Sequence, residues 1–157
     1  MLEPLSAQAH NLAVLKTTAR FETSLAKWSK VDGHLKGLAV MAAAARLGCE
    51  WCMDFGYWVT ATGGIAESKL QQLADWRDSD AFTPLERLVI EYAEAMSSTP
   101  IQVSDELTVS LREHLSEAQL VELTMMIAVE NQRSRFNSAL GLGAQGFKDR
   151  CELPSIR

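Results

Sequence analysis

The sequence predicts an all-helical protein, and three observations lead to this class. Helix start signals recur along the chain, and apolar residues repeat at helical spacing. No stretch of β-branched residues alternates with polar ones over the length of a strand. No linker-like change of composition and no repeat of fixed period divides the 157 residues. We therefore expect one domain over residues 1–157, an orthogonal or bundle-like array of roughly seven helices.

The first half of the chain should form four helices. The centre of the second, residues 38–45, is rich in alanine and has no polar face. We expect it to be buried on nearly all sides, with small side chains that let neighbouring helices approach closely. Gly48 should end this helix in the left-handed conformation, so that the third helix opens at or beside Cys49. The expected ranges are about 11–29, 34–47, 49–61 and 66–76.

The second half carries the strongest start signals. Thr83, Pro84 and Glu86 combine a cap residue, proline at the first helical position and glutamate at the third. An apolar stripe at i, i+3, i+4 and i+7 spacing follows them. Ser116 and Gln119 form a second capping box before a long helix. The expected ranges here are about 84–96, 104–114 and 116–140.

Composition excludes several classes of function. The net charge of −5 and the scattered Lys and Arg residues argue against a nucleic-acid partner. The N-terminal segment lacks the features of a signal peptide, and the longest apolar run, residues 38–45, is too short to cross a membrane. Three cysteines do not suit a secreted disulfide framework. We expect a cytoplasmic protein with no membrane contact.

The most informative motif is Cys49-Glu50-Trp51-Cys52 at the start of a helix. Cysteines at i and i+3 lie on one helix face, close enough to form a disulfide with little backbone movement. The amides and dipole of a helix N-terminus favour the thiolate and raise its reactivity. The pattern therefore favours thiol–disulfide exchange over two small buried side chains without chemistry.

A metal site is the weaker interpretation of these cysteines. Structural zinc needs four ligands, and no second Cys-x-x-Cys or His-x-x-x-His is present. The three histidines, His10, His34 and His114, stand alone in the sequence. We expect no metal and no cofactor. The missing strands also exclude a thioredoxin-like βαβ architecture.

Residues 38–52, LAVMAAAARLGCEWC, resemble the core motif of the carboxymuconolactone decarboxylase superfamily, in its alkylhydroperoxidase D branch. That motif is an alanine-rich helix followed by Gly-Cys-x-x-Cys at the start of the next helix. The resemblance covers about residues 30–147, and it is specific through the order and spacing of its pieces rather than through any single one. The further matching pieces are Leu85-Glu-Arg87, Val103-Ser-Asp-Glu-Leu107, Leu120-Val-Glu-Leu123, and Asn131, Arg135-Phe-Asn137 and Ala139-Leu140 in the last helix.

The resemblance implies an all-helical subunit of a homo-oligomer that reduces small-molecule hydroperoxides and is itself reduced by a dithiol electron donor. By position, Cys52 would attack the peroxide, and Cys49 would resolve the sulfenic acid as a disulfide. The family's peroxidases also carry a proton relay of one glutamate and two histidines. Here those positions hold Gly37, Trp51 and Gly56, so this chain should be a poor peroxidase by that mechanism.

Four other groups are candidates for a relay or for support of the site: Asp54, Glu50, Glu86 and His34. Asp54 is closest in sequence, but a nearby carboxylate would raise a thiol pKa by like-charge repulsion. We favour Asp54 as a first-turn acid that complements the helix dipole. Glu86 also caps its own helix, and the sequence does not place it relative to the cysteines.

Trp51, Phe55, Tyr57 and Trp58 cluster around the cysteines. Packing in the core or between subunits is the favoured interpretation, although Trp51, Phe55 and Trp58 would also suit an apolar pocket wall for a hydrophobic substrate.

Asn131 and Arg135 share a helix face, and we expect a structural polar pair in which Arg135 contacts Glu86 or Glu130. Cys151 lies in a polar tail and is expected to be an exposed, unpaired thiol.

Three functions remain open. The favoured one is a thiol-dependent peroxidase or disulfide oxidoreductase that uses Cys49 and Cys52. The alternative from another class is a catalytically silent or redox-sensing oligomeric scaffold or ligand-binding protein, which the missing relay keeps in play. Lactone decarboxylation is less favoured, because that branch of the superfamily typically lacks the two cysteines.

Overall fold

A computed structural model describes residues 2–148, and this part of the chain is all-helical, as predicted. It contains eight α-helices and one short 3-10 helix, and no strand. The bounds are α1 Glu3–Ala9, α2 Leu12–Leu25, α3 Gly33–Leu47, α4 Glu50–Thr62, α5 Glu67–Gln71, η1 Leu73–Asp75, α6 Pro84–Met96, α7 Asp105–Arg112 and α8 Glu117–Ala139.

The N-terminal segment differs most from the expected elements. The helix expected over 11–29 ends at Leu25, and α1 precedes it. Asn11 separates α1 from α2, because its side-chain oxygen accepts hydrogen bonds from the amides of Ala13 and Val14 and so caps α2. The expected short helix over 66–76 is divided into α5 and η1.

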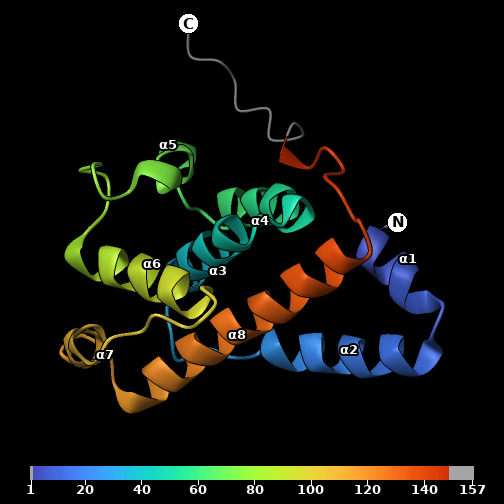
Figure 1. Ribbon diagram of the computed structural model, residues 1–157, viewed down its shortest axis with the longest axis horizontal. Helices are drawn as coiled ribbons and strands as arrows, with labels where there is room; N and C mark the ends of the chain where they lie inside the picture. Colours follow the sequence, from blue (N-terminus) through green and yellow to red (C-terminus); the bar gives the residue numbers. More distant parts are fainter. Residues whose placement is uncertain (1, 149–157) are drawn as a thin grey trace, which may run out of the picture.

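Helix α3 forms the centre of the fold and packs against α4, α6 and α8 (Figure 1). Ala39, Ala43 and Ala44 have no exposed surface, and Leu38 is equally buried. This confirms that residues 38–45 are largely enclosed, although Ala45 itself is exposed. Side chains of one carbon keep the neighbouring helices close to the α3 backbone.

Two glycines mark close contacts around α3. A Cβ atom added at Gly37 would lie 2.8 Å from Ile65 Cδ1 and 3.0 Å from Thr60 Cγ2. A Cβ added at Gly56, on α4, would lie 2.8 Å from Met41 Sδ. The absence of a side chain at both positions allows α3 and α4 to pack at this separation.

The predicted helix ends are formed by the expected residues. Thr83 with Glu86 and Ser116 with Gln119 make reciprocal capping boxes at α6 and α8. Gly48 adopts the left-handed conformation, with φ 67° and ψ 30°, immediately after α3.

Helices α1 and α2 lie beside the C-terminal half of α8, whereas α6 and α7 lie on the other side of α3 (Figure 1). Arg133 of α8 holds α2 through an ion pair with Glu22, at 2.5 Å. Glu122 of α8 accepts hydrogen bonds from the amides of Lys30 and Val31 and so fixes the connection from α2 to α3. None of the helices in the described part of the chain is both long enough and apolar enough to cross a membrane.

We predict that Gly37→Val lowers the free energy of unfolding by about 1–3 kcal/mol, because the new side chain overlaps Thr60 and Ile65. Gly33→Val is the matched control, since an added Cβ there has no neighbour within 4 Å. It should change stability by less than about 0.5 kcal/mol. Urea unfolding of both variants measures the difference, and equal effects would contradict the close packing.

Candidate active site: the Cys49–Cys52 pair

The turn between α3 and α4 positions the two cysteines. Left-handed Gly48 reverses the chain, and the amide of Cys49 donates to the carbonyl of Ala44 at 3.1 Å. Cys49 is then the N-cap residue of α4, and its sulfur accepts a hydrogen bond from the amide of Cys52 at 3.2 Å. The pair therefore lies at the helix N-terminus, as the sequence predicted.

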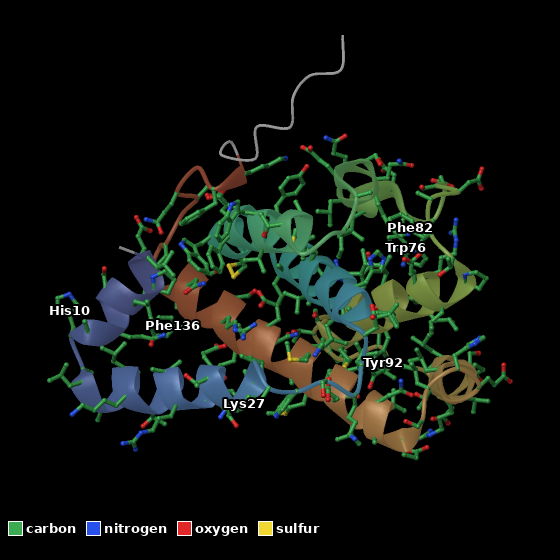
Figure 2. The ribbon with its side chains drawn as sticks, turned by 180° about the vertical axis from the view of Figure 1, so that it is seen from behind. His10, Lys27, Trp76, Phe82, Tyr92 and Phe136 are labelled. Atoms are coloured by element: carbon green, nitrogen blue, oxygen red, sulfur yellow. A yellow bond between two sulfur atoms is a disulfide. The ribbon has the colours of Figure 1, made fainter. Side chains whose placement is uncertain are left out.

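Cys49 and Cys52 are joined by a disulfide, with 5.2 Å between their Cα atoms. Figure 2 shows the yellow sulfur–sulfur bond where α4 meets the C-terminal half of α8. Cys49 is 1% exposed and Cys52 is 6% exposed, so Cys52 is the more accessible of the two. Ala44 and Trp51 complete this small buried cluster.

Three polar side chains of α8 surround one side of the disulfide: Asn137 and Ser134 contact a sulfur, and Glu130 contacts Ser134. Asn137 donates to Cys52 Sγ at 3.4 Å and lies 3.9 Å from Cys49 Sγ. The Ser134 hydroxyl lies 3.5 Å from Cys52 Sγ and 3.1 Å from Glu130 Oε1. All three side chains are buried, with exposed fractions of 1–3%. The sulfurs therefore have hydrogen-bonding partners although they lie in an apolar core.

Burial raises the pKa of Glu130 to about 7, although Arg133 and Ser134 act in the opposite direction. Arg133 lies 3.3 Å from Glu130 Oε2 but makes two shorter contacts, at 2.9 and 2.5 Å, with Glu22. The guanidinium is thus mainly paired with Glu22, and the charge of Glu130 is only partly compensated.

The positions that hold the relay in the family's peroxidases serve other purposes here. At Gly37 and Gly56 the close packing of α3 and α4 leaves no room for a side chain. The Trp51 indole N–H donates to Gln145 Oε1 at 2.9 Å. None of these three positions therefore supplies an acid–base group to the sulfurs.

The prediction that Asp54 is a first-turn acid is wrong: it lies beyond the first turn of α4 and anchors the segment that follows α8. Its carboxylate accepts hydrogen bonds from the amides of Gln145, Phe147 and Lys148, at 2.7, 3.0 and 2.7 Å. Burial acts to raise the pKa of Asp54, but these amides outweigh it and hold the pKa below its usual value. Glu50 is exposed in the first turn of α4, where it complements the helix dipole.

The aromatic residues of α4 pack on one another and on the segment that Asp54 anchors. Trp51 stacks on Phe55 with 4.8 Å between ring centroids, and Phe55 lies 5.8 Å from Trp58. Phe147 meets Phe55 edge to face at 5.2 Å and lies 6.0 Å from Trp58. The three predicted wall residues therefore pack together with Phe147.

His34 and Glu86 are brought to each other rather than to the cysteines. His34 Nε2 lies 2.5 Å from Glu86 Oε1, and Lys69 Nζ lies 2.8 Å from the same oxygen. Burial acts to raise the pKa of Glu86, but Lys69, the Thr83 amide and His34 lower it to about 2. His34 is at the opposite end of α3 from Cys49, roughly 20 Å away at the rise of an α-helix.

The expected pairing of Arg135 with Glu86 or Glu130 is wrong. Arg135 is exposed, and its guanidinium reaches Thr99 Oγ1 at 3.5 Å. Glu130 pairs instead with Arg133, which points toward α2. Asn131 donates to Ser97 Oγ at 2.9 Å, so Asn131 and Arg135 both contact the connection between α6 and α7. Cys151 lies outside the described residues.

Sequence reasoning missed Glu130, Ser134 and Asn137 as neighbours of the cysteines. Their i, i+4, i+7 spacing places them on one face of a long helix, which is the signal that could have found them. Two shallow surface cavities of about 390 and 360 Å³ lie elsewhere, beside the connection between α6 and α7 and beside Arg46. Within residues 2–148, no group of three or more His, Cys, Asp or Glu side chains is arranged to hold a metal ion.

Comparison with known proteins extends these observations. The model of the carboxymuconolactone decarboxylase family matches residues 13–95. The uncharacterized protein YnjA of Escherichia coli K12 is 39% identical over 131 residues, which cover 83% of this chain and 70% of that protein.

Two crystal structures share the fold. The debrominase Bmp8 superposes with a TM-score of 0.85 at 18% identity, over 93% of this chain and 78% of that one. ATU0492 of Agrobacterium tumefaciens, a protein of unknown function named in connection with AhpD antioxidant defence, gives 0.78 at 20% identity, over 88% and 94%. At these identities the structural likeness establishes the fold alone.

We predict that Asp54→Asn lowers the free energy of unfolding at pH 7 by about 1–3 kcal/mol, because the amides of the anchored segment lose a charged acceptor. The wild-type contribution is present above pH 3.8, the unfolded value, and is lost as pH falls through the lower folded pKa. Asp80→Asn, at an exposed position, is the control. Urea unfolding at pH 7 and pH 3 should show a gap between Asp54→Asn and wild type that narrows in acid; a constant gap would contradict the role of the charge.

Proposed function

Because the chain belongs to the carboxymuconolactone decarboxylase family, we propose that it is a dithiol–disulfide oxidoreductase that reduces hydroperoxides through Cys49 and Cys52. The observation that carries the proposal is the disulfide at the N-terminus of α4, with hydrogen-bond donors at both sulfurs. Donors of this kind stabilise a thiolate, which is the reactive form of cysteine. A purely structural pair of small apolar side chains would not need them.

In the proposed cycle, the Cys52 thiolate attacks the outer oxygen of a hydroperoxide. The O–O bond breaks, Cys52 becomes a sulfenic acid, and the alkoxide leaves as an alcohol after taking up a proton. The Cys49 thiol then attacks the sulfenic sulfur, releases water and forms the disulfide. A dithiol donor restores both thiols and is itself oxidised to a disulfide. The greater exposure of Cys52 supports its role as the attacking residue.

The alternative is a catalytically silent or redox-sensing protein in which the same disulfide has no turnover. The glycines at positions 37 and 56, where the family's peroxidases have acid–base residues, favour this alternative. The rate of hydroperoxide consumption with a dithiol donor distinguishes the enzyme from a silent protein, because a silent protein adds nothing to the rate of the donor alone.

We predict that Cys52→Ser reduces the consumption of cumene hydroperoxide, with dithiothreitol as donor, to the level without protein. In the absence of dithiothreitol, prereduced Cys49→Ser should consume about one equivalent and retain a sulfenic acid on Cys52 that dimedone labels. Cys151→Ser is the matched control and should keep the wild-type rate. If Cys52→Ser consumes hydroperoxide like the wild type, the proposed function is wrong.

We also propose that the chain forms a homo-oligomer. Large apolar side chains are exposed on the outward faces of two helices, Leu12 and Val14 on α2 and Val121 and Met125 on α8. Contact between copies of the chain would remove such surface from water. Size-exclusion chromatography with light scattering should give a mass of more than one chain at micromolar concentration. A single-chain mass would contradict this proposal.

A further inference from the structure

A continuous series of hydrogen-bonding groups links the reactive sulfur to a buried acid. Cys52 Sγ, the Ser134 hydroxyl and Glu130 Oε1 are separated by 3.5 and 3.1 Å. Ser134 is 1% exposed and Glu130 is 3% exposed, so bulk water has little access to the series. A proton that leaves Cys52 toward α8 therefore meets Ser134 first.

We propose that Ser134 and Glu130 form a proton relay for Cys52, in which Ser134 contacts the reacting sulfur and Glu130 stores the proton. This inference rests on the proposed dithiol chemistry, because it concerns the activation of the same thiol. It gives the site acid–base groups from α8, where the α3 and α4 positions provide none.

The chemistry of a hydroxyl group suits this position. A serine hydroxyl donates one hydrogen bond and accepts others, so it can reverse its direction. When Glu130 is a carboxylate, Ser134 donates to it and accepts from the Cys52 thiol. When Glu130 is protonated, it donates to Ser134, which donates to the thiolate. The two states differ by a concerted shift of two protons and need no movement of heavy atoms.

The surroundings of Glu130 make it a suitable proton acceptor. Burial raises its pKa to about 7, close to the range in which a thiol at a helix N-terminus ionises. The charged groups that face Glu130 are Arg133 on its own helix and Glu22 on α2. Because Glu22 takes the shorter contacts of Arg133, Glu130 can accept a proton without leaving the guanidinium unpaired.

The relay balances the proposed reaction. The thiol proton passes to the Ser134 oxygen as the Ser134 proton passes to Glu130, which leaves a thiolate on Cys52. After attack on the outer peroxide oxygen, the departing alkoxide takes a proton from Ser134, and Glu130 returns its proton to the serine. Glu130 ends as a carboxylate, and the products are one alcohol and one sulfenic acid.

The test follows thiolate formation rather than peroxidase activity. In a reduced Cys49→Ser background, the rate at which iodoacetamide alkylates Cys52 is measured from pH 5 to 10. Peptide-level mass spectrometry separates Cys52 from Cys151. With the relay, the rate should rise in two steps, the first near pH 7, because the proton lost there is shared between Glu130 and Cys52.

Adding Glu130→Gln should leave a single step in the alkylation rate, at a pH above that of the first step, because no carboxylate remains to take up the thiol proton. Ser134→Ala should lower the rate at pH 7 by about tenfold, and Glu130→Gln should cause no further change in that background. Both substitutions are close to isosteric, and circular dichroism checks that the variants fold. Glu22→Gln removes the other carboxylate from Arg133 but leaves the Cys52, Ser134 and Glu130 groups in place, so it should keep two steps. The first step should move to lower pH, because the charge of Glu22 helps to raise the pKa of Glu130.

An unchanged profile in Glu130→Gln would overturn the relay. A Glu22→Gln profile that reproduces the single, higher-pH step of Glu130→Gln would also overturn it, because the effect would then be one of charge alone. The outcome is separable from that of the proposed function. If the alkylation profiles follow the relay while Cys52→Ser still consumes hydroperoxide like the wild type, the relay stands and the peroxidase proposal fails.

Discussion

The close packing around α3 is the constraint on which the rest of the structure depends. Its buried centre consists largely of alanine, and Gly37 and Gly56 lack the side chains that would push α4 and its neighbours away. Helices packed at short separation are fixed in position, because interiors tolerate little change of volume. This fixes the direction in which α4 leaves Gly48, and therefore the place where Cys49 and Cys52 meet α8.

The same packing determines which helix can assist the cysteines. A glutamate at position 37 or a histidine at position 56 would need the space that Ile65, Thr60 and Met41 occupy. Helix α8 faces the disulfide from the other side and offers Ser134 and Asn137 to the sulfurs. The close packing of α3 and α4 thus leaves α8 as the helix whose polar side chains contact the sulfurs.

Much of this fold could be predicted because its signals are local. The capping boxes at Thr83 and Ser116, the left-handed Gly48 and the alanine-rich stretch each depend on neighbours within one or two helical turns. Arg135 shows where local reasoning fails: it was expected to pair with an acid, but Arg133 takes Glu130, because the rotation of α8 turns position 133 toward α2. Asp54 shows the same failure, since its partners are amides more than ninety residues away in the chain.

The sequence predicted the segment that carries the two cysteines but not the residues of α8 that contact them. Spacing placed Cys49 and Cys52 together, whereas Ser134 meets Cys52, and Glu130 meets Ser134, only because two distant helices cross. The crossing also makes the two sulfurs unequal. Cys49 accepts from the amide of its own helix, and Cys52 receives the side chains of α8 and retains more exposed surface. Donors alone would stabilise either thiolate, but Cys52 also has the larger exposed fraction and the contact with Ser134, and both support the proposal that it is the attacking residue.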